Sequence, residues 1–141
     1  MSSHVYHEIF LHLNWHTKFS MPLLNPALEE RVYARLTERI ARTKGAWLHG
    51  IGGTATHVHL AISIEPSVTI SDLVQTLKGG TSHDINSQTN DKVLQWQRGY
   101  GVVSFGKNNL PWIQSYLERQ KEHHAAGKTH ERLEWVSHDE Q

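Results

Sequence analysis

The order in which two hydrophobic periodicities alternate along the chain constrains its fold more than any other feature. Strands are predicted where every second residue is apolar, in segments 6–15, 46–51, 57–64 and 96–105. Helices are predicted where apolar residues recur three or four positions apart, in segments 26–44, 70–78 and 109–126. The resulting order, β-α-β-β-α-β-α, predicts an α+β, ferredoxin-like sandwich. In this fold a split βαβ arrangement builds an antiparallel sheet, and the last helix is an addition.

Local patterns add three expectations about burial and boundaries. The first strand is expected to be half-buried, with its leucines toward the core and with His12 and Asn14 on the other face. The second helix is expected to end at 78–80, where two glycines occur, and 82–89 can add another turn or two. The polar residues after 128 predict a loosely held tail.

Length and composition indicate one folded domain. The 141 residues fit a single core, and we expect one domain over 1–141. The chain carries 14 Lys+Arg and 14 Asp+Glu, is 38% hydrophobic and has five Trp, which argues against disorder. No apolar run reaches the roughly 18 residues of a membrane helix, and the N-terminus lacks a signal-peptide pattern. We therefore expect a cytoplasmic protein with no membrane partner.

The cysteine and histidine counts restrict the chemistry. The chain has no Cys, which excludes disulfides, cysteine-bound metal sites and a thiol nucleophile. Its 12 His are the unusual feature of the composition, and imidazole is the commonest metal ligand. Any metal would be held by His, carboxylate or amide groups. The formal net charge of zero lacks the basic excess that marks many nucleic-acid-binding proteins.

Two short motifs place reactive side chains together. His57 and His59 lie two apart on a predicted strand, so their imidazoles share a face and can meet one metal ion. Tyr116 and Gln120 lie four apart and share a face of the last helix. Each motif alone also fits a structural role, as surface histidines or as the edge of the core. The segment 96–101, WQRGYG, interleaves aromatic and basic residues, which suits stacking on unpaired bases but also packing in a sheet.

Five motifs occur in order over most of the chain. They are WHTK at 15–18, HVHL at 57–60, LVQTLKG at 73–79, WQRGYG at 96–101, and YLERQ at 116–120 followed by EHH at 122–124. Together they resemble the single-tyrosine HUH transposases of bacterial insertion sequences, including the REP-associated tyrosine transposases. The resemblance implies a metal-dependent endonuclease and strand transferase acting on single-stranded DNA. In such enzymes a tyrosine forms a 5′-phosphotyrosine intermediate at element ends marked by hairpins.

The resemblance also implies roles for particular residues. The implied nucleophile is Tyr116. The implied ligands of Mg²⁺, with Mn²⁺ as the alternative ion, are His57, His59 and Gln120. DNA contacts are implied for four residues of the shared motifs: Lys18, Lys78, Arg98 and Tyr100. The partners implied are DNA hairpins and a second copy in a homodimer, and the location is nucleoid-associated. The resemblance leaves open which hairpin is bound and whether the tyrosine serves its own His pair or the partner's.

A second interpretation stays open, because the sequence departs from the family in two ways. His16 stands where relatives often carry Arg, and the net charge is low for a DNA transposase. The alternative is a catalytically silent or domesticated nucleic-acid-binding module, although Tyr116 and the His pair are present. A metal-buffering protein is disfavoured because the histidines are dispersed. The following histidines are expected to be exposed or capping groups: His4, His7, His12, His49, His83, His123, His124, His130 and His138. Of these, His124 is placed to face the tyrosine site.

Overall fold

The protein is an antiparallel sheet with helices on both faces, seen in a computed structural model that describes residues 4–136. The strands are β1 (Phe10–His16), β2 (Ala46–Gly53), β3 (His57–Ile64) and β4 (Gly101–Phe105). The helices are α1 (Pro26–Ala41), α2 (Ile70–Thr89), α3 (Leu110–Glu118), α4 (Gln120–Ala125) and α5 (Glu131–Glu134), with short turns η1 (Lys18–Ser20) and η2 (Lys107–Asn109). The strand order β2-β3-β1-β4, antiparallel throughout, confirms the predicted ferredoxin-like α+β fold.

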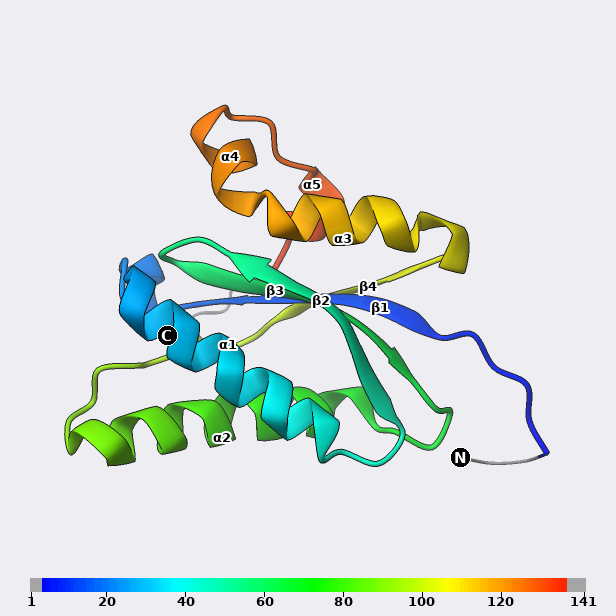
Figure 1. Cartoon of the computed structure of the whole chain (residues 1–141), viewed down its shortest axis with the longest axis horizontal. Helices are drawn as coiled ribbons and strands as arrows, with labels where there is room; N and C mark the ends of the chain where they lie inside the picture. The colour runs from blue at the N-terminus through cyan, green and yellow to red at the C-terminus, as the bar shows by residue number, and fades with distance from the viewer. Residues whose placement is uncertain (1–3, 137–141) are drawn as a thin grey trace.

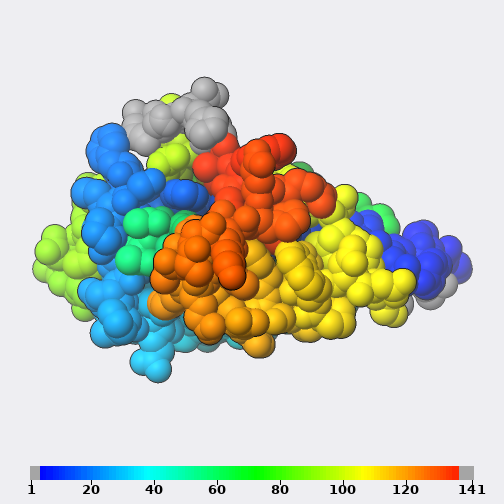
Figure 2. All heavy atoms as spheres, turned by 90° about the horizontal axis from the view of Figure 1, so that it is seen from above, coloured from blue at the N-terminus to red at the C-terminus, as the bar shows by residue number. Residues whose placement is uncertain are grey.

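The helices divide between the two faces of the sheet. Helices α1 and α2 cover one face, and α3, α4 and α5 lie over the other (Figure 1). Figure 2 looks down on the second face and shows these last three helices, in yellow to red, spread over the sheet. The larger apolar cluster lies between the sheet and α1 and α2, and a smaller one lies under α3 and α5. Among the described residues, no helix has the length and apolar character needed to cross a bilayer.

The first strand is buried on both faces, which corrects the expectation of a half-buried strand. Leu13 and Trp15 face the main core and are fully buried. His12 and Asn14, on the opposite face, are each only 1% exposed. The sequence pattern placed these polar residues correctly on one face, but that face is covered by the C-terminal helices rather than by water. The sheet therefore carries a buried polar strip.

Helix α2 runs through Gly79 and Gly80, where the sequence predicted its end. Its buried face continues to Ile85, which is fully buried. Arg39 of α1 also ties the two helices by donating two hydrogen bonds to Asp84, of 3.0 and 2.9 Å. Packing thus outweighs the poor helix propensity of the two glycines, about 1 kcal/mol each.

The C-terminal third differs from the predicted pattern in three places. The predicted strand 96–105 is shorter, since β4 begins at Gly101 and Trp96 forms only an isolated bridge to Thr17. The predicted last helix is broken at Arg119, whose φ of −110° and ψ of 26° separate α3 from α4. The tail expected to be loosely held forms α5, and Leu133 there is only 2% exposed. His138 lies outside the described residues.

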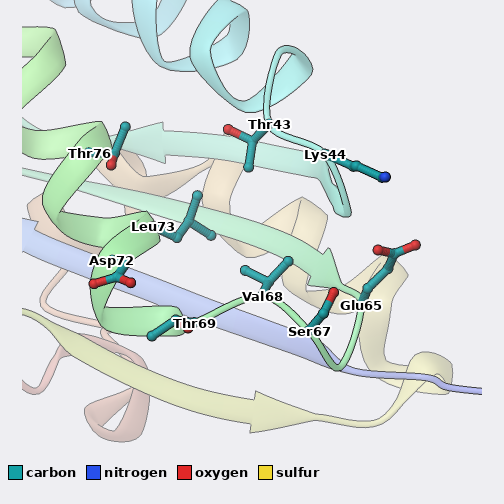
Figure 3. Close-up of a pocket in the computed structure, with 9 residues that line it drawn as sticks. All are labelled: Thr43, Lys44, Glu65, Ser67, Val68, Thr69, Asp72, Leu73 and Thr76. Carbon is teal, nitrogen blue, oxygen red and sulfur yellow. The ribbon is translucent and has the colours of Figure 1, made fainter. Parts of the chain in front are cut away.

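A polar cavity of about 400 Å³ lies at the α1–α2 face (Figure 3). It opens between the turn after α1, the end of β3 and the start of α2, and its charged lining residues are Lys44, Glu65 and Asp72. His57 stands at the other end of β3, about 23 Å away along a strand of this length. This cavity is therefore separate from the histidine pair.

The two glycines of α2 give a matched test of its continuity. A Cβ at Gly79 would meet nothing within 4 Å, so Gly79→Ala should raise the free energy of unfolding by about 0.5–1 kcal/mol. A Cβ at Gly80 would lie 2.3 Å from Arg39 Cζ and displace the guanidinium from Asp84. The free energy of unfolding should therefore rise less in Gly80→Ala than in Gly79→Ala. Chemical denaturation measures both variants beside the wild type. A clear loss of stability in Gly79→Ala would contradict a continuous helix.

Candidate active site

The pleat of β3 sends His57 and His59 to the face beneath α3, α4 and α5. Val58, between them, is fully buried in the main core on the other face. His57 lies opposite His16 of β1 in the strand register, and His59 lies opposite Asn14. The two imidazoles are therefore side by side, with ring centroids 4.9 Å apart.

Hydrogen bonds at Nδ1 set the orientation of both rings. His57 Nδ1 lies 3.1 Å from the Thr54 hydroxyl and 3.0 Å from the Thr56 hydroxyl, both in the turn before β3. His59 Nδ1 lies 2.8 Å from Nε2 of His12 on β1. The Nε2 atoms of His57 and His59 consequently point away from the sheet, toward the C-terminal helices.

A glutamate from α5 meets these nitrogen atoms. Oε1 of Glu134 lies 3.4 Å from His57 Nε2, 3.3 Å from His59 Nε2 and 3.3 Å from Nε2 of His124 on α4. We call these four residues the histidine cluster; one ligand atom from each lies within 4.8 Å of the others. Burial alone would raise the pKa of the Glu134 carboxyl, but its close contacts with the imidazoles of His57 and His59 hold that pKa well below its usual range. Glu134 is thus a carboxylate.

Tyr116 is hydrogen-bonded to the same carboxylate. Its hydroxyl donates a 2.5 Å hydrogen bond to Oε2 of Glu134 and accepts one of 2.8 Å from the His130 backbone N–H. The phenol ring is stacked between Trp112, at 5.4 Å and 14°, and His123, at 4.9 Å and 19°. Burial, and then the hydrogen bond to Glu134, raise the pKa of Tyr116 to about 12, so the hydroxyl keeps its proton at neutral pH.

Gln120 lies at the first position of α4, directly after the break at Arg119. It is 1% exposed, and neither its Oε1 nor its Nε2 has a hydrogen-bond partner among the described residues. Buried amides are normally hydrogen-bonded, so this side chain lacks the polar partner that its environment calls for. A bound ion or substrate would supply one.

Helix α5 is held over the sheet by hydrogen bonds from Asn14, a residue of the buried polar strip on β1. Asn14 Nδ2 donates to the backbone carbonyls of Leu133, at 3.1 Å, and Trp135, at 2.9 Å. The Trp135 carbonyl would lie 1.9 Å from a Cβ on Gly101 of β4, so only glycine permits that approach. These contacts place Glu134 beside the three histidines of the cluster.

The donor set of the histidine cluster fits a divalent metal. Four ligands at about 2.0–2.1 Å from a tetrahedral ion lie about 3.3–3.4 Å apart, whereas neighbouring ligands of an octahedral Mg²⁺ lie about 2.8–3.0 Å apart. The 3.3–3.4 Å separations around Glu134 Oε1 match the first geometry, and the 4.8 Å limit shows that the set as a whole is more open. Three imidazoles and a carboxylate also suit a transition metal better than Mg²⁺.

The four implied DNA contacts have different surroundings. Lys18 and Arg98 belong to neighbouring segments, since the backbone N–H of Lys18 donates to the backbone carbonyl of Gln95, three residues before Arg98. Lys78 instead donates to the carbonyls of Gln97 and Gly99, both at 2.8 Å, and Tyr100 packs against the main core. The structure therefore leaves Arg98 exposed and gives Lys78 and Tyr100 structural contacts.

Two residues of this site, Glu134 and His12, lie where the sequence did not predict them. Glu134 was assigned to a loose tail, although the apolar residues beside it, Leu133 and Trp135, were a signal of docking. His12 was expected to be exposed or capping, but it is buried and contacts His59. His124 does reach the cluster, as its eight-residue spacing from Tyr116 suggested.

Comparisons with known proteins identify relatives in sequence and in fold. The family model described as IS200-like transposase matches residues 5–120. Over 80 residues the chain is 32% identical to the transposase for insertion sequence element IS200 of Salmonella typhimurium, and equally to that of Salmonella typhi. Each match covers 52% of this chain and 52% of the relative, so the chain spans about half the length of these curated relatives.

Two solved structures share the fold. A putative transposase from Deinococcus radiodurans R1 matches with a TM-score of 0.67 and 24% identity, over 85% of this chain and 96% of that one. A REP-associated tyrosine transposase bound to a REP hairpin matches with a TM-score of 0.63 and 10% identity, over 92% and 76% of the two chains. At these identities the likeness shows the fold.

Buried imidazoles make the metal-free protein sensitive to acid. Burial lowers the pKa of His12 to about 2 and those of His16 and His59 to about 4. Between pH 6.5 and about 4 the unfolded chain binds more protons than the native one, so stability falls as the pH falls. We expect the melting temperature, measured with a chelator present, to fall from about pH 7 to pH 4.5, and less steeply in His12→Leu. A constant melting temperature would contradict these shifts.

Proposed function

Because the chain belongs to the family of IS200-like transposases, we propose that it cleaves and rejoins single-stranded DNA with Tyr116 as the nucleophile. One observation carries the proposal: a single carboxylate, Glu134, contacts both the Tyr116 hydroxyl and the Nε2 atoms of His57 and His59. A nucleophile and a set of metal ligands are thus brought together in one buried place. A scaffold that only binds DNA has no need for this convergence.

The proposed reaction exchanges one phosphodiester bond for another. The Tyr116 oxygen attacks phosphorus and gives up its proton to water, the bond from phosphorus to the 3′ oxygen breaks, and that oxygen takes up a proton, so the leaving strand carries a 3′-hydroxyl. The other strand is then linked to the protein as a 5′-phosphotyrosine. Attack by a 3′-hydroxyl on that linkage reverses the exchange and joins the strands, because the bond energy is kept in the phosphotyrosine.

The Tyr116 proton is the main obstacle to attack. With the phenol pKa raised to about 12 and the Glu134 pKa held well below its usual range, the proton stays on the phenol. Glu134 therefore orients the hydroxyl as a hydrogen-bond acceptor and is a weak base by itself. A divalent cation would supply the positive charge that neutralises the phosphate and makes phosphorus more electrophilic. Trp112 and His123 hold the phenol ring in place by stacking on both of its faces.

We propose that His57 and His59 hold this cation, with Gln120, His124 and Glu134 as the further donors around them. The unpaired buried amide of Gln120 supports its place in the set. Sequence resemblance implied Mg²⁺ with Mn²⁺ as the alternative. Three imidazoles and the 3.3–3.4 Å spacing around Glu134 are instead typical of a tetrahedral transition-metal site such as that of Zn²⁺, and Mn²⁺ is the implied ion that a metal-binding experiment can follow. The carboxylate of Glu134 also occupies space next to Tyr116 that a scissile phosphate would need, so the DNA must displace it in part.

DNA with hairpin structure is the proposed substrate, encountered in the cytoplasm at the nucleoid. The support is the family, together with a structural neighbour bound to a REP hairpin. The exposed Arg98 and the neighbouring Lys18 lie beside the end of β1, where His16 stacks on His57 at 4.7 Å. They are the proposed phosphate contacts nearest the cluster.

The proposed assembly is a homodimer in which each chain has its own site. The strand order leaves one edge of β2 and one edge of β4 unpaired among the described residues, and exposed edges favour association. Tyr116 and His59 of the same chain lie 6.4 Å apart between ring centroids. The tyrosine can therefore serve its own histidines.

Removal of the phenol oxygen should abolish covalent chemistry. Tyr116→Phe keeps the ring that packs against Trp112 but cannot form a phosphotyrosine, so no protein–DNA adduct should survive on a denaturing gel, while hairpin binding stays largely intact. An adduct that persists in this variant would show that Tyr116 is not the nucleophile. The silent-module alternative predicts no adduct even with the wild-type protein.

Loss of one histidine should abolish cleavage through loss of the metal. His57→Ala and His59→Ala should each weaken Mn²⁺ binding and stop cleavage while Tyr116 is still present, and high Mn²⁺ should restore some activity. His49→Ala, on β2 and hydrogen-bonded to Ser63, is the matched control. Cleavage with the same metal dependence in all three variants would mean that the pair is structural.

Mixed dimers test which chain completes each site. When Tyr116→Phe and His57→Ala subunits are combined, a site formed within one chain stays broken in every subunit, so activity should not return. Recovered cleavage would show that the tyrosine acts on the partner's histidines. Light scattering checks the assembly itself, and a monomeric mass at micromolar concentration would reject the dimer.

A further inference from the structure

His12 stands behind the histidine cluster and has no role in the chemistry described so far. It lies on β1, on the same face as Asn14 and His16, and it is 1% exposed. Its Nε2 is 2.8 Å from Nδ1 of His59, which is fully buried, and the two rings lie 4.9 Å apart. A histidine 47 residues away in sequence thus contacts the far side of a proposed metal ligand.

The protons of this pair can be assigned for the metal-bound state, in which the cation rather than the Glu134 carboxylate, 3.3 Å away, meets Nε2 of His59. One proton lies between His59 Nδ1 and His12 Nε2. If His59 is to offer the Nε2 lone pair to a cation, its proton must be on Nδ1. His12 must then accept at Nε2 and carry its own proton on Nδ1. His12 thereby selects the tautomer of His59 that can bind metal.

We propose that His12 is a positioning residue that holds His59 in the Nδ1–H tautomer, with Nε2 directed at the cation. The inference rests on the proposed function, since it assigns a second residue to the same metal site. Metal-binding histidines usually donate their other N–H to a carboxylate or a backbone carbonyl. Here the acceptor is a neutral imidazole, which fixes the tautomer without adding a buried charge.

The unused nitrogen of His12 argues against a packing role. Its Nδ1 is buried and has no hydrogen-bond partner among the described residues. An apolar side chain of similar size would fill the place without that unpaired group. The cost of the unpaired nitrogen is accounted for if the opposite nitrogen is needed as an acceptor for His59.

His57 shows that the two ligands are oriented by separate devices. Its Nδ1 faces the hydroxyls of Thr54 and Thr56 in the adjoining turn, so its orientation is set locally. His59 has only the contact across the sheet to His12 at its Nδ1. A change at His12 should therefore affect one ligand of the pair and leave the other in place.

Two substitutions separate acceptance of the hydrogen bond from packing. His12→Leu fills the space without an acceptor, and His12→Gln can place its amide oxygen near the former Nε2 position. We expect His12→Leu to bind Mn²⁺ about 10- to 100-fold more weakly in calorimetric titration of the full chain, and His12→Gln to recover most of that affinity. His49→Leu, a partly buried histidine on the same sheet but outside the cluster, should bind as the wild type does.

Four outcomes overturn or separate the claims. Wild-type affinity in His12→Leu overturns the inference, and so does an equal loss in His12→Leu and His12→Gln, which would mean packing only. If the wild-type protein binds no Mn²⁺, the proposed metal site fails, and the inference is then decided by a measurement that uses no metal. Long-range ¹H–¹⁵N spectra of metal-free Glu134→Ala, in which no carboxylate faces His59 Nε2, should show His59 as the Nδ1–H tautomer, and an Nε2–H tautomer would overturn the inference even if both His12 variants fail to fold.

Discussion

The pleat of β3 is the constraint on which the rest of the site depends. Because successive side chains point to opposite faces, Val58 anchors the strand in the main core while His57 and His59 emerge together on the other face. A shift of the register by one residue would turn both imidazoles into the main core and send Val58 to the opposite face. Pairing on both sides, with β2 and with β1, fixes that register. The position of the two histidines is thus determined by the sheet rather than by a loop.

The polar face created by this pleat has to be covered and satisfied, and that requirement organises the C-terminal third of the chain. Asn14 binds two backbone carbonyls of the α5 region, and the Tyr116 hydroxyl accepts from the His130 N–H. These hydrogen bonds bring the end of the chain back over the sheet, where a carboxylate joins the imidazoles. The same contacts leave both polar atoms of Gln120 and the Nε2 atoms of His57, His59 and His124 without a hydrogen-bond partner among the described residues.

The sequence predicted the part of this structure that follows from local periodicity. Strand and helix order, the shared face of His57 and His59, and the shared face of Tyr116 and Gln120 follow from local spacings, whereas the meeting of the Tyr116 helix with the histidine pair was implied by the family resemblance. It could not predict what depends on contacts far apart in the chain. His12 is buried because the C-terminal helices cover its face of the sheet. Helix α2 continues past its two glycines because it packs against α1. Glu134 lies at the site because Asn14 and Gly101 contact the α5 region. The sequence therefore identified the histidines but could not predict which of them are buried at the site.

The central claim is that nucleophile and metal ligands share one place within a single chain. Crystals of the wild-type protein grown with Mn²⁺ test it most directly, through the anomalous scattering of the ion. We expect a strong peak bonded to Nε2 of His57 and His59, beside the Tyr116 hydroxyl of the same chain. A peak elsewhere in the molecule, with none between these two histidines, would contradict it.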